Sequence, residues 1–510
     1  MNFMAEQVRA LTDLFALIAE QGYMLTRQGV TPTSKVSLLT ADSREVSPGA
    51  LFVAVKGSTQ DGHQYVPAAI EQGARAVVAE HIAPEWVAQY PGVSFAQVTD
   101  SRKVLAVLAA AFYGYPAREM LLIGITGTNG KTTTAYLVHH LLSSRGEKVG
   151  LLGTVMYQVG NQRYPSTHTT PDAVALHRML RMMRDVGCTS CVMEVSSHAL
   201  AQDRVHGLAF DVAVFTNLTQ DHLDYHRSFE AYFHAKRRLF EALSPRGFGW
   251  FNADDPWGKQ MVAGIDRCVI GYGLGEEACL RGEILENSLR GLVLRVEGRT
   301  GHFPLVGRFN AYNLLAAYGV GKVLGMEGWE ILHQLEQAPA VPGRFEQVRL
   351  EGVEGPQVIV DYAHTPDALE NVLATIRGTG VHAEQLWCVF GCGGDRDPQK
   401  RSMMGAVAES LAGKVVVTSD NPRTESPEQI IAHILAGMKW PDRVVVLPDR
   451  REAIQYAIQH AAPSDTILIA GKGHETYQII GTQQIAFDDR EEARRALSQR
   501  CTTNHLGEQV

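Results

Sequence analysis

Residues 121–142 read LLIGITGTNGKTTTAYLVHHLL, so an apolar run leads through a glycine-rich turn into a helix-like pattern. In such a turn backbone N–H groups converge on phosphate oxygens, and the N-terminus of the next helix adds partial positive charge. We expect Lys131 to reach the β- and γ-phosphates of a nucleotide and the Thr132 hydroxyl to bind Mg²⁺. The loop is a variant, because the strict G-x-x-x-x-G-K-[ST] pattern would place its first glycine at Ile125. The candidate nucleotide residues are Gly127, Thr128, Asn129, Gly130, Lys131, Thr132 and Thr133.

Two other apolar runs end in polar residues that could do chemistry. Glu194 ends CVMEV, and a carboxylate at a strand end near a phosphate loop suits a second Mg²⁺ contact. The segment FTNLTQDHLDYH holds His222 and His226 at i, i+4, a spacing that could suggest zinc. No HExxH pattern with a third ligand accompanies them, so structural or substrate-proximal histidines are favoured.

The whole chain limits the class of protein. Its 510 residues exceed one hydrophobic core and suggest about three domains. A net charge of −8 argues against nucleic acid or an anionic membrane as the main partner. The N-terminal sequence lacks signal-peptide features, and no apolar stretch approaches the roughly 18 residues of a spanning helix. The seven cysteines suggest no disulfide framework, and the pairs 188/191 and 388/392 are interpreted as buried thiols. We therefore expect a reduced, cytoplasmic protein without membrane insertion.

Three regions differ in pattern, and we expect an α/β protein of three domains. Residues 1–117 carry the short strands and turns of a mixed α/β unit. Residues 118–343 follow the breakers in YGYPAREM and alternate apolar runs with helical patterns, which is typical of a parallel sheet covered by helices. Residues 344–510 follow a second break at AVPGRFE and repeat that alternation in a Rossmann-like unit.

Eight segments, in order, carry a resemblance to a known family: GTNGKTTT, EVSSHAL, TNLTQDHLDYH, AKRRLF, GRFNAYNLLAA, PGRFE, DYAHTPDAL and GGDRD. They resemble the Mur ligases, the ATP-dependent amino-acid-adding enzymes of bacterial peptidoglycan synthesis. The resemblance implies a UDP-binding first domain, a central ATPase domain and a C-terminal domain for the incoming amino acid. It also implies the reaction: ATP converts a carboxyl group to an acyl phosphate, an amine attacks it, and phosphate leaves an amide.

Within the family, the chain is most similar to the members that add the third residue of the peptide. They join meso-diaminopimelate to the D-glutamate γ-carboxyl of UDP-N-acetylmuramoyl-L-alanyl-D-glutamate, and a monomer is expected. The resemblance implies catalytic roles for Lys131, Lys236 and His222. Lys236 matches the family's carbamylated lysine (N6-carboxylysine), whose carboxylate would join Thr132 and Glu194 around Mg²⁺.

The remaining nucleotide and sugar contacts also come from the resemblance. Asn310 and Asn313 match adenine contacts, whereas Arg344, Asp361 and His364 match residues that close on ATP from the C-terminal domain, so domain closure is expected to assemble the site. The residues that match the UDP-sugar site are Ser43, Ser58, Thr59 and Gln60. Those that match contacts to the muramoyl-dipeptide arm are His168, Thr169, Thr170, Ser196, Gln202 and Arg204.

The stretch SDNPRTES, which ends an apolar run, bears on the incoming amino acid. Diaminopimelate carries an additional carboxylate beside its far ammonium, and lysine lacks this carboxylate. A site for that end needs a guanidinium for the carboxylate and an acid or amide for the ammonium. The turn Asp420, Asn421, Pro422 and Arg423 supplies both and matches the diaminopimelate signature. Arg396, Gly471 and Glu475 match its other contacts and also follow strands, where ligands bind in open α/β sheets.

Three alternatives stay open at this point. The first is the same reaction with L-lysine, because lysine enzymes resemble this signature up to the proline. The second is a folylpolyglutamate synthetase, which shares the phosphate loop but should lack a UDP-binding first domain. The third is a nucleotide-binding switch or scaffold without ligation, which would leave the polar loops of the last region unexplained.

Overall fold

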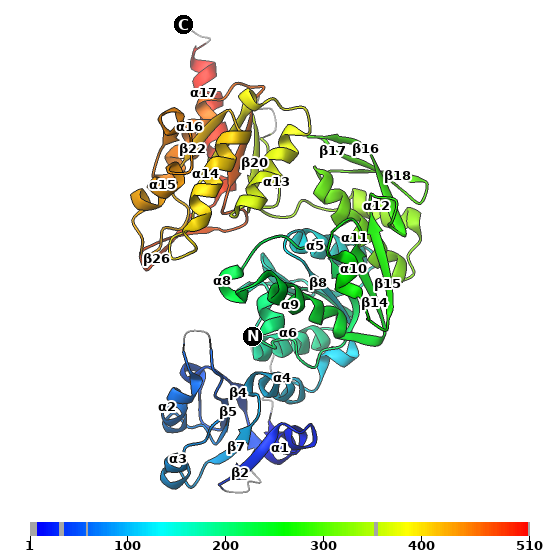
Figure 1. Cartoon of the computed structure of the whole chain (residues 1–510), viewed down its shortest axis with the longest axis vertical. Coiled ribbons are helices and arrows are strands. Elements are labelled where there is room, and N and C mark those ends of the chain that lie inside the picture. The colour runs from blue at the N-terminus through cyan, green and yellow to red at the C-terminus, as the bar shows by residue number, and fades with distance from the viewer. Residues whose placement is uncertain (1–7, 30–34, 58–59, 351–354, 508–510) are drawn as a thin grey trace.

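The computed structural model describes residues 8–29, 35–57, 60–350 and 355–507. Three α/β units, each with its own sheet, follow one another along an elongated molecule, as the sequence predicts (Figure 1). The N-terminal unit (blue) and the C-terminal unit (yellow to red) lie at opposite ends of the central one. Among the described helices, none combines the length and the apolar character needed to cross a bilayer.

The first unit is built on a five-stranded sheet in the order β2-β7-β6-β5-β4. Strands β4 to β7 run parallel, and β2 pairs antiparallel with β7. Every residue of β5 and β6 is buried, as expected of parallel strands covered on both faces. The elements are β1 (Arg9–Ala10), α1 (Leu11–Glu20), β2 (Met24–Gln28), β3 (Lys35–Val36), β4 (Leu38–Thr40), β5 (Ala50–Val53), α2 (Val66–Glu71), β6 (Ala76–Ala79), α3 (Pro84–Gln89), β7 (Ser94–Val98) and α4 (Ser101–Phe112).

The central unit contains an eleven-stranded sheet in the order β11-β10-β9-β12-β8-β13-β14-β15-β16-β17-β18. The middle of this sheet, from β9 through β12, β8, β13, β14 and β15 to β16, is parallel. This confirms the parallel sheet expected here. The strands are β8 (Leu121–Thr126), β9 (Val149–Leu152), β10 (Met156–Val159), β11 (Gln162–Pro165), β12 (Ser190–Glu194), β13 (Phe210–Phe215), β14 (Leu243–Asn252), β15 (Cys268–Gly273), β16 (Leu280–Ser288), β17 (Gly291–Val296) and β18 (Arg299–Phe303).

Helices cover both faces of this sheet. One hydrophobic core joins β8, β12 and β13 to α5 and α11, and a second joins the other faces of the same strands to α6 and α9. The edges differ from the prediction, because β10 and β11 at one end and β17 and β18 at the other are antiparallel hairpin strands. The helices are α5 (Lys131–Ser144), α6 (Ala173–Asp185), α7 (Ser197–Ala201), α8 (Leu223–His226), α9 (Phe229–Glu241), α10 (Gly258–Val262), α11 (Arg308–Val323) and α12 (Gly328–Glu336).

The third unit is a doubly wound sheet in the order β19-β20-β24-β21-β22-β23, parallel apart from β19. An additional hairpin, β25–β26, was not predicted. The predicted thiols Cys388 and Cys392 are buried here, as are Cys188 and Cys191 in the central unit. The elements are β19 (Glu346–Val348), β20 (Gln357–Asp361), α13 (Pro366–Arg377), β21 (Leu386–Phe390), α14 (Gln399–Leu411), β22 (Lys414–Val417), α15 (Pro427–Leu435), β23 (Val445–Val446), α16 (Arg450–His460), β24 (Thr466–Ala470), β25 (Tyr477–Ile480), β26 (Gln483–Ala486) and α17 (Asp489–Gly507).

Candidate active site

The phosphate loop connects β8 to α5, the strand–turn–helix context that the sequence predicts. Gly127 and Gly130 have φ angles of 148° and 84°, a backbone region that side chains rarely adopt. A Cβ atom at Gly127 would lie 1.9 Å from the Thr216 hydroxyl oxygen, and one at Gly130 would lie 2.5 Å from Asn313 Oδ1. Glycine is therefore required at both positions for the loop to pack against its neighbours.

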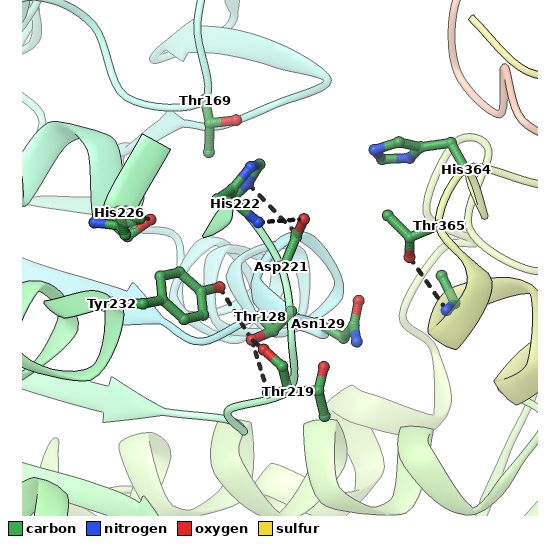
Figure 2. Close-up of polar contacts among 12 residues, drawn as sticks. Thr128, Asn129, Thr169, Thr219, Asp221, His222, His226, Tyr232, His364 and Thr365 are labelled. Carbon is green, nitrogen blue, oxygen red and sulfur yellow. Dashed lines mark hydrogen bonds and ion pairs between the residues drawn. The ribbon is translucent and has the colours of Figure 1, made fainter. Parts of the chain in front are cut away.

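Hydrogen bonds hold this loop in shape. Lys131 Nζ donates to the carbonyl oxygens of Gly127 and Thr128, at 2.9 and 2.8 Å. The Thr128 hydroxyl lies 3.1 Å from the Tyr232 hydroxyl and donates to the Thr219 carbonyl (Figure 2). Burial lowers the pKa of Lys131. The loop thus presents a partly buried cation beside its backbone N–H groups, which suits a polyphosphate.

Thr132 and Glu194 lie together, as the sequence predicts for a Mg²⁺ site. The Thr132 hydroxyl donates to Glu194 Oε2 at 3.0 Å, and the backbone N–H and hydroxyl of Thr154 donate to the same carboxylate at 2.8 and 3.0 Å. Hydroxyl and carboxylate oxygens are the ligands that Mg²⁺ prefers, and Mg²⁺ commonly shares its coordination with substrate phosphates. The donor set therefore fits this ion. In the described part of the chain, no three His, Cys, Asp or Glu side chains form a metal cluster.

Lys236 is buried on α9 directly behind the phosphate loop, with 1% of its surface exposed. Its Nζ donates to the Gly127 carbonyl at 2.6 Å and lies 4.5 Å from the centroid of the Tyr232 ring. Burial and the nearby Lys131 lower the pKa of Lys236 well below its ordinary value. Burial therefore shifts this side chain toward the neutral, nucleophilic amine.

His222 and His226 do not converge on a common ligand site. His222 has a φ of 53°, lies next to Asp221 with Nε2 3.4 Å from Oδ2, and lines the large cleft described below. His226 is buried and its Nε2 lies 3.0 Å from the Ser197 hydroxyl. The structural or substrate-proximal interpretation is therefore the one that their positions favour.

The C-terminal unit reaches the phosphate loop through Arg344. Its Nη2 donates to the Thr132 hydroxyl at 3.2 Å, and its guanidinium lies 4.6 Å from the Tyr362 ring centroid. Asp361 is buried, accepts backbone hydrogen bonds from Phe345 and Ala363, and has a pKa raised by burial. Figure 2 shows His222 and His364 on opposite sides of the space between the two units.

Asn310 and Asn313 are buried in the first turns of α11, below the phosphate loop. Asn313 Nδ2 donates to Asn310 Oδ1 at 2.9 Å, and its own Oδ1 accepts from the Thr134 hydroxyl. Asn310 Nδ2 donates to the Val306 carbonyl. In the structure these amides therefore bind protein groups and support the loop, and their expected contact with adenine stays a prediction.

A cleft of about 1720 Å³ lies between the central and C-terminal units. Its central wall carries Thr154, His168, Thr169, Asp221 and His222. Its other wall carries residues of the loops that follow β20, β21, β22 and β24, namely His364, Arg396, Asp420, Asn421, Arg423, Gly471 and Glu475. Thr154, which bonds Glu194 beside the nucleotide loop, and the predicted amino-acid residues thus line one shared space, as expected of ligand binding at the carboxyl ends of strands.

The predicted muramoyl-dipeptide residues form a connected group on the central unit. Arg204 donates to the Thr170 carbonyl and to Gln202 Oε1, at 2.8 and 3.0 Å, and the Thr170 hydroxyl accepts from the Ser196 N–H. Thr169 bonds the Thr154 hydroxyl. The predicted UDP residues lie on the first unit, and Ser58 and Thr59 fall outside the described residues. No hydrogen bond between described residues joins Ser43 or Gln60 to the central group.

The predicted amino-acid residues are fixed by neighbouring loops. Arg423 has a φ of 52°, its backbone bonds Ile479 and Gly481 beside β25, and its Nη1 donates to the Gly394 carbonyl at 2.6 Å. Asn421 Nδ2 donates to Glu475 Oε2 at 2.9 Å. Gly471 has a φ of 118°, and a Cβ there would lie 2.4 Å from Asp420 Oδ2. The turn after β22 and the loop after β24 therefore form one surface.

Several residues at the site were missed by sequence reasoning. Asp367 accepts hydrogen bonds from Asn129 and Thr219, and Lys472 lies buried beneath Glu475. Asp367 stands within DYAHTPDAL and Lys472 within AGKGHE, so both motifs contained the signal. The sequence carries no comparable signal for Arg401, because only the fold shows that its partner is Glu425.

Comparison with known proteins agrees with this arrangement. The profile of the Mur ligase family, catalytic domain, matches residues 35–113, that of the Mur ligase middle domain matches residues 125–321, and that of the Mur ligase, glutamate ligase domain, matches residues 343–473. The matches follow the order of the three units.

Solved structures share the fold. One titled as a UDP-N-acetylmuramoyl-L-alanyl-D-glutamate–2,6-diaminopimelate ligase is 33% identical, with a TM-score of 0.62 over 91% of this chain and 95% of that chain. A Mycobacterium tuberculosis folylpolyglutamate synthase complexed with ADP and AMPPCP has a TM-score of 0.58 over 71% of this chain and 91% of that chain. At 21% identity the second likeness is one of fold alone.

Other relatives are more similar to this chain in sequence than these two solved structures are. A protein of Thermosynechococcus vestitus (strain BP-1), named UDP-N-acetylmuramoyl-L-alanyl-D-glutamate–2,6-diaminopimelate ligase, is 47% identical over 489 residues. The similarity covers 94% of this chain and 97% of that protein, so it spans all three units and not the phosphate loop alone. The chain therefore belongs to the Mur ligase family.

Proposed function

We propose that this protein joins meso-diaminopimelate to the D-glutamate γ-carboxyl of UDP-N-acetylmuramoyl-L-alanyl-D-glutamate. ATP is consumed, and ADP, phosphate and the UDP-linked tripeptide are formed. The observation that carries the proposal is the shared cleft, because Thr154 lines it together with the Asp420–Arg423 turn. The Thr154 hydroxyl bonds Glu194, which also accepts from Thr132 of the nucleotide loop. The name of the 47% identical relative supports the same reaction.

The first step requires activation of a poor electrophile. A γ-carboxylate oxygen attacks the γ-phosphorus of ATP, the bond from that phosphorus to the bridging oxygen breaks, and ADP leaves. Several anionic oxygens then crowd together, and cationic groups must stabilise them. Lys131 on the loop and Arg344, whose guanidinium bonds the Thr132 hydroxyl, are the groups placed to do so.

The second step forms the amide. The amine of diaminopimelate attacks the acyl carbon, and the tetrahedral intermediate collapses with cleavage of the carbon–oxygen bond to phosphate. The nitrogen loses a proton and phosphate leaves. The cleft favours this step because its two walls would hold the amine and the acyl phosphate close together. We assign His222 to the central wall beside the reacting groups.

Thr132, Glu194 and Lys236 are the residues proposed to hold Mg²⁺. When bound, the ion would neutralise phosphate charge and orient the phosphate oxygens. Lys236 can contribute after carbamylation, in which its neutral amine attacks CO₂ and loses a proton to give a carbamate. Its burial and lowered pKa support that reaction, because they favour the unprotonated amine. The carbamate would also place an anionic ligand behind the loop, where the buried amine lies.

The incoming amino acid is assigned to the C-terminal wall. Arg423 and Arg396 would bind carboxylates of diaminopimelate, and Asp420, Asn421 and Glu475 would face its far ammonium. The UDP-sugar would extend from the Thr169–Arg204 group toward Ser43 on the first unit. One chain holds all three substrates in this proposal, and the reaction takes place in the cytoplasm.

The test is an ATP-dependent phosphate-release assay with the UDP-linked dipeptide and either meso-diaminopimelate or L-lysine. We expect turnover with meso-diaminopimelate and kcat/KM for L-lysine lower by about 100-fold or more, since L-lysine lacks the far carboxylate and its charged contact to Arg423 is lost. A preference for L-lysine would overturn the choice of amino acid and leave the ligase reaction standing. Phosphate release without the dipeptide, at the same rate, would overturn ligation.

A further inference from the structure

Lys472 is a fully buried cation beneath the proposed amino-acid wall. It follows β24 in the segment AGKGHE, and none of its surface is exposed. Its Nζ donates to Asn421 Oδ1 at 3.1 Å and to Glu475 Oε2 at 3.0 Å. The Tyr477 ring lies with its centroid 5.6 Å from the same nitrogen. A buried ammonium is costly unless it is paired and hydrogen-bonded, so this geometry is closely specified.

The three polar side chains form a closed ring of hydrogen bonds. Asn421 Nδ2 donates to Glu475 Oε2 at 2.9 Å, while Lys472 bonds both of these residues. The Ile479 N–H also donates to Asn421 Oδ1, at 2.9 Å, which fixes the orientation of the amide. Both hydrogen bonds to the Glu475 carboxylate, among the described residues, fall on Oε2. The other oxygen, Oε1, is thereby set in a fixed direction on a residue that lines the cleft.

Lys472 also supplies the positive charge that pairs with the Glu475 carboxylate, with Nζ 3.0 Å from Oε2. The far end of diaminopimelate is a zwitterion, with one carboxylate and one ammonium. Arg423 and Arg396 line the cleft on the carboxylate side in this scheme, and Glu475 faces the ammonium. Without Lys472, Glu475 would lose its cationic partner and one of its two hydrogen bonds among the described residues.

We propose that Lys472 is a positioning residue that, together with Asn421, orients Glu475 to receive the far ammonium of the amino-acid substrate. This inference rests on the proposed function, since it takes diaminopimelate as that substrate. Lys472 itself touches no substrate in this scheme, because it is fully buried and its Nζ bonds Asn421 and Glu475. Its effect is exerted through Glu475.

Four full-length variants test the role by kinetics: Lys472→Met, Glu475→Gln, the double variant, and Lys414→Met. Lys414 is the matched control, because its Nζ bonds Asp465 at 2.9 Å in the same unit but at the far end of β22. We expect Lys472→Met to raise the KM for meso-diaminopimelate by about tenfold or more, as for a lost charged hydrogen bond. The KM values for ATP and the UDP-linked dipeptide should stay within about twofold, as should every KM of Lys414→Met.

The double variant separates positioning from stability. If Lys472 acts through Glu475, the double variant should have the same KM for meso-diaminopimelate as Glu475→Gln alone, within about twofold. A further tenfold rise in the double variant, or an unchanged KM in Lys472→Met, overturns the proposal. Failure of both Lys472 variants to fold, judged by circular dichroism, would assign the residue to stability and also overturn it.

A substrate analogue distinguishes a failure of this inference from a failure of the proposed function. 2-Aminopimelate keeps the far carboxylate and lacks the far ammonium, so the ratio of its KM to that of meso-diaminopimelate measures ammonium recognition. We expect Lys472→Met to lower that ratio by about tenfold. A wild-type enzyme that prefers L-lysine would refute the proposed function, whereas a wild-type preference for meso-diaminopimelate with an unchanged ratio in the variant would refute only the role of Lys472.

Discussion

Asp367 Oδ2 accepts a hydrogen bond from Asn129 Nδ2 at 2.9 Å and so joins the first turn of α13 to the phosphate loop. The same oxygen accepts from the Thr219 hydroxyl at 3.1 Å. One carboxylate of the C-terminal unit therefore contacts both polar segments that form the nucleotide wall. The position of that unit is coupled to the loop, as expected of a site that domain closure completes.

Asp367→Ala should slow turnover, because it leaves the amide of Asn129 and the hydroxyl of Thr219 without their common acceptor. We expect kcat to fall by about tenfold, the effect of losing hydrogen bonds to a charged group. Asp367→Asn is the control, since its amide oxygen can still accept, and its kcat should stay within about threefold of wild type. Steady-state kinetics at saturating substrates measures both, and equal kcat for wild type and Asp367→Ala would contradict the coupling.

Arg344→Lys should weaken the use of ATP although the charge is kept. The guanidinium of Arg344 stacks over Tyr362 while its Nη2 reaches the Thr132 hydroxyl, and an ammonium cannot do both. We expect the KM for ATP to rise by about tenfold, measured by ADP release. Tyr362→Asn removes the ring and should show part of the same rise, whereas Tyr362→Phe should match wild type. An unchanged KM in Arg344→Lys would show that the contact is not used.

Lys236→Ala should abolish activity, because it removes the side chain proposed to carry the carbamate. We expect added short-chain carboxylates such as formate or acetate to restore part of the turnover by taking the place of the missing anion. Intact-protein mass spectrometry of the wild type should also show a species heavier by one CO₂. The matched control is Lys259→Ala, an exposed lysine of the same unit that bonds Glu277. Wild-type turnover in Lys236→Ala would rule out the carbamate role.

The sequence was sufficient for the elements that carry the site. The run LLIGIT is apolar throughout, because β8 is buried between helices on both faces, and such runs predict central parallel strands. The phosphate-loop glycines could also be predicted, since the φ angles of Gly127 and Gly130 are ones that side chains rarely adopt. The antiparallel edges were missed although their turns were present: Gly160, with a φ of 57°, closes the β10–β11 hairpin.

Contacts between distant segments were beyond sequence reasoning. Nothing in the order of residues relates Asp367 to Asn129, which are 238 positions apart, or Lys472 to Asn421. Whether a polar side chain of a motif faces the ligand or a neighbour also depends on packing. Asn421 lines the cleft, and its amide also bonds Glu475, Lys472 and the Ile479 N–H, while its expected contact with the substrate stays a prediction.

Arg423→Ala should impair the use of meso-diaminopimelate while ATP binding is unaffected. One guanidinium–carboxylate pair is lost from an enclosed site, so we expect the KM for meso-diaminopimelate to rise by about 30-fold, equivalent to about 2 kcal/mol. ATP affinity, measured by titration calorimetry with a non-hydrolysable analogue, should match wild type. Arg443→Ala removes an exposed arginine that packs on Trp440 in the same unit and is the control. Unchanged kinetics in Arg423→Ala would refute the assignment of this turn.

The pair Arg401 and Glu425 should make stability depend on acid pH. Arg401 donates to both carboxylate oxygens at 2.8 Å and lowers the pKa of Glu425 to about 2 from its ordinary 4.5. Because the folded-state pKa lies below the unfolded one, the pairing stabilises the fold fully above pH 4.5, and this contribution is lost as the pH falls from 4.5 toward 2. Glu425→Gln should therefore unfold at a lower urea concentration than wild type at pH 7.

The difference in free energy of unfolding between wild type and Glu425→Gln should become smaller as the pH is lowered below 4.5. Urea titrations at successive pH values measure this difference. Glu452→Gln, which changes an exposed carboxylate of α16, is the control and should differ little from wild type across that range. If the difference in free energy of unfolding between wild type and Glu425→Gln stays constant down to the acid transition, the carboxylate contributes by packing. In that case, the loop after Arg423 would be held by its backbone contacts to β25 and not by charge.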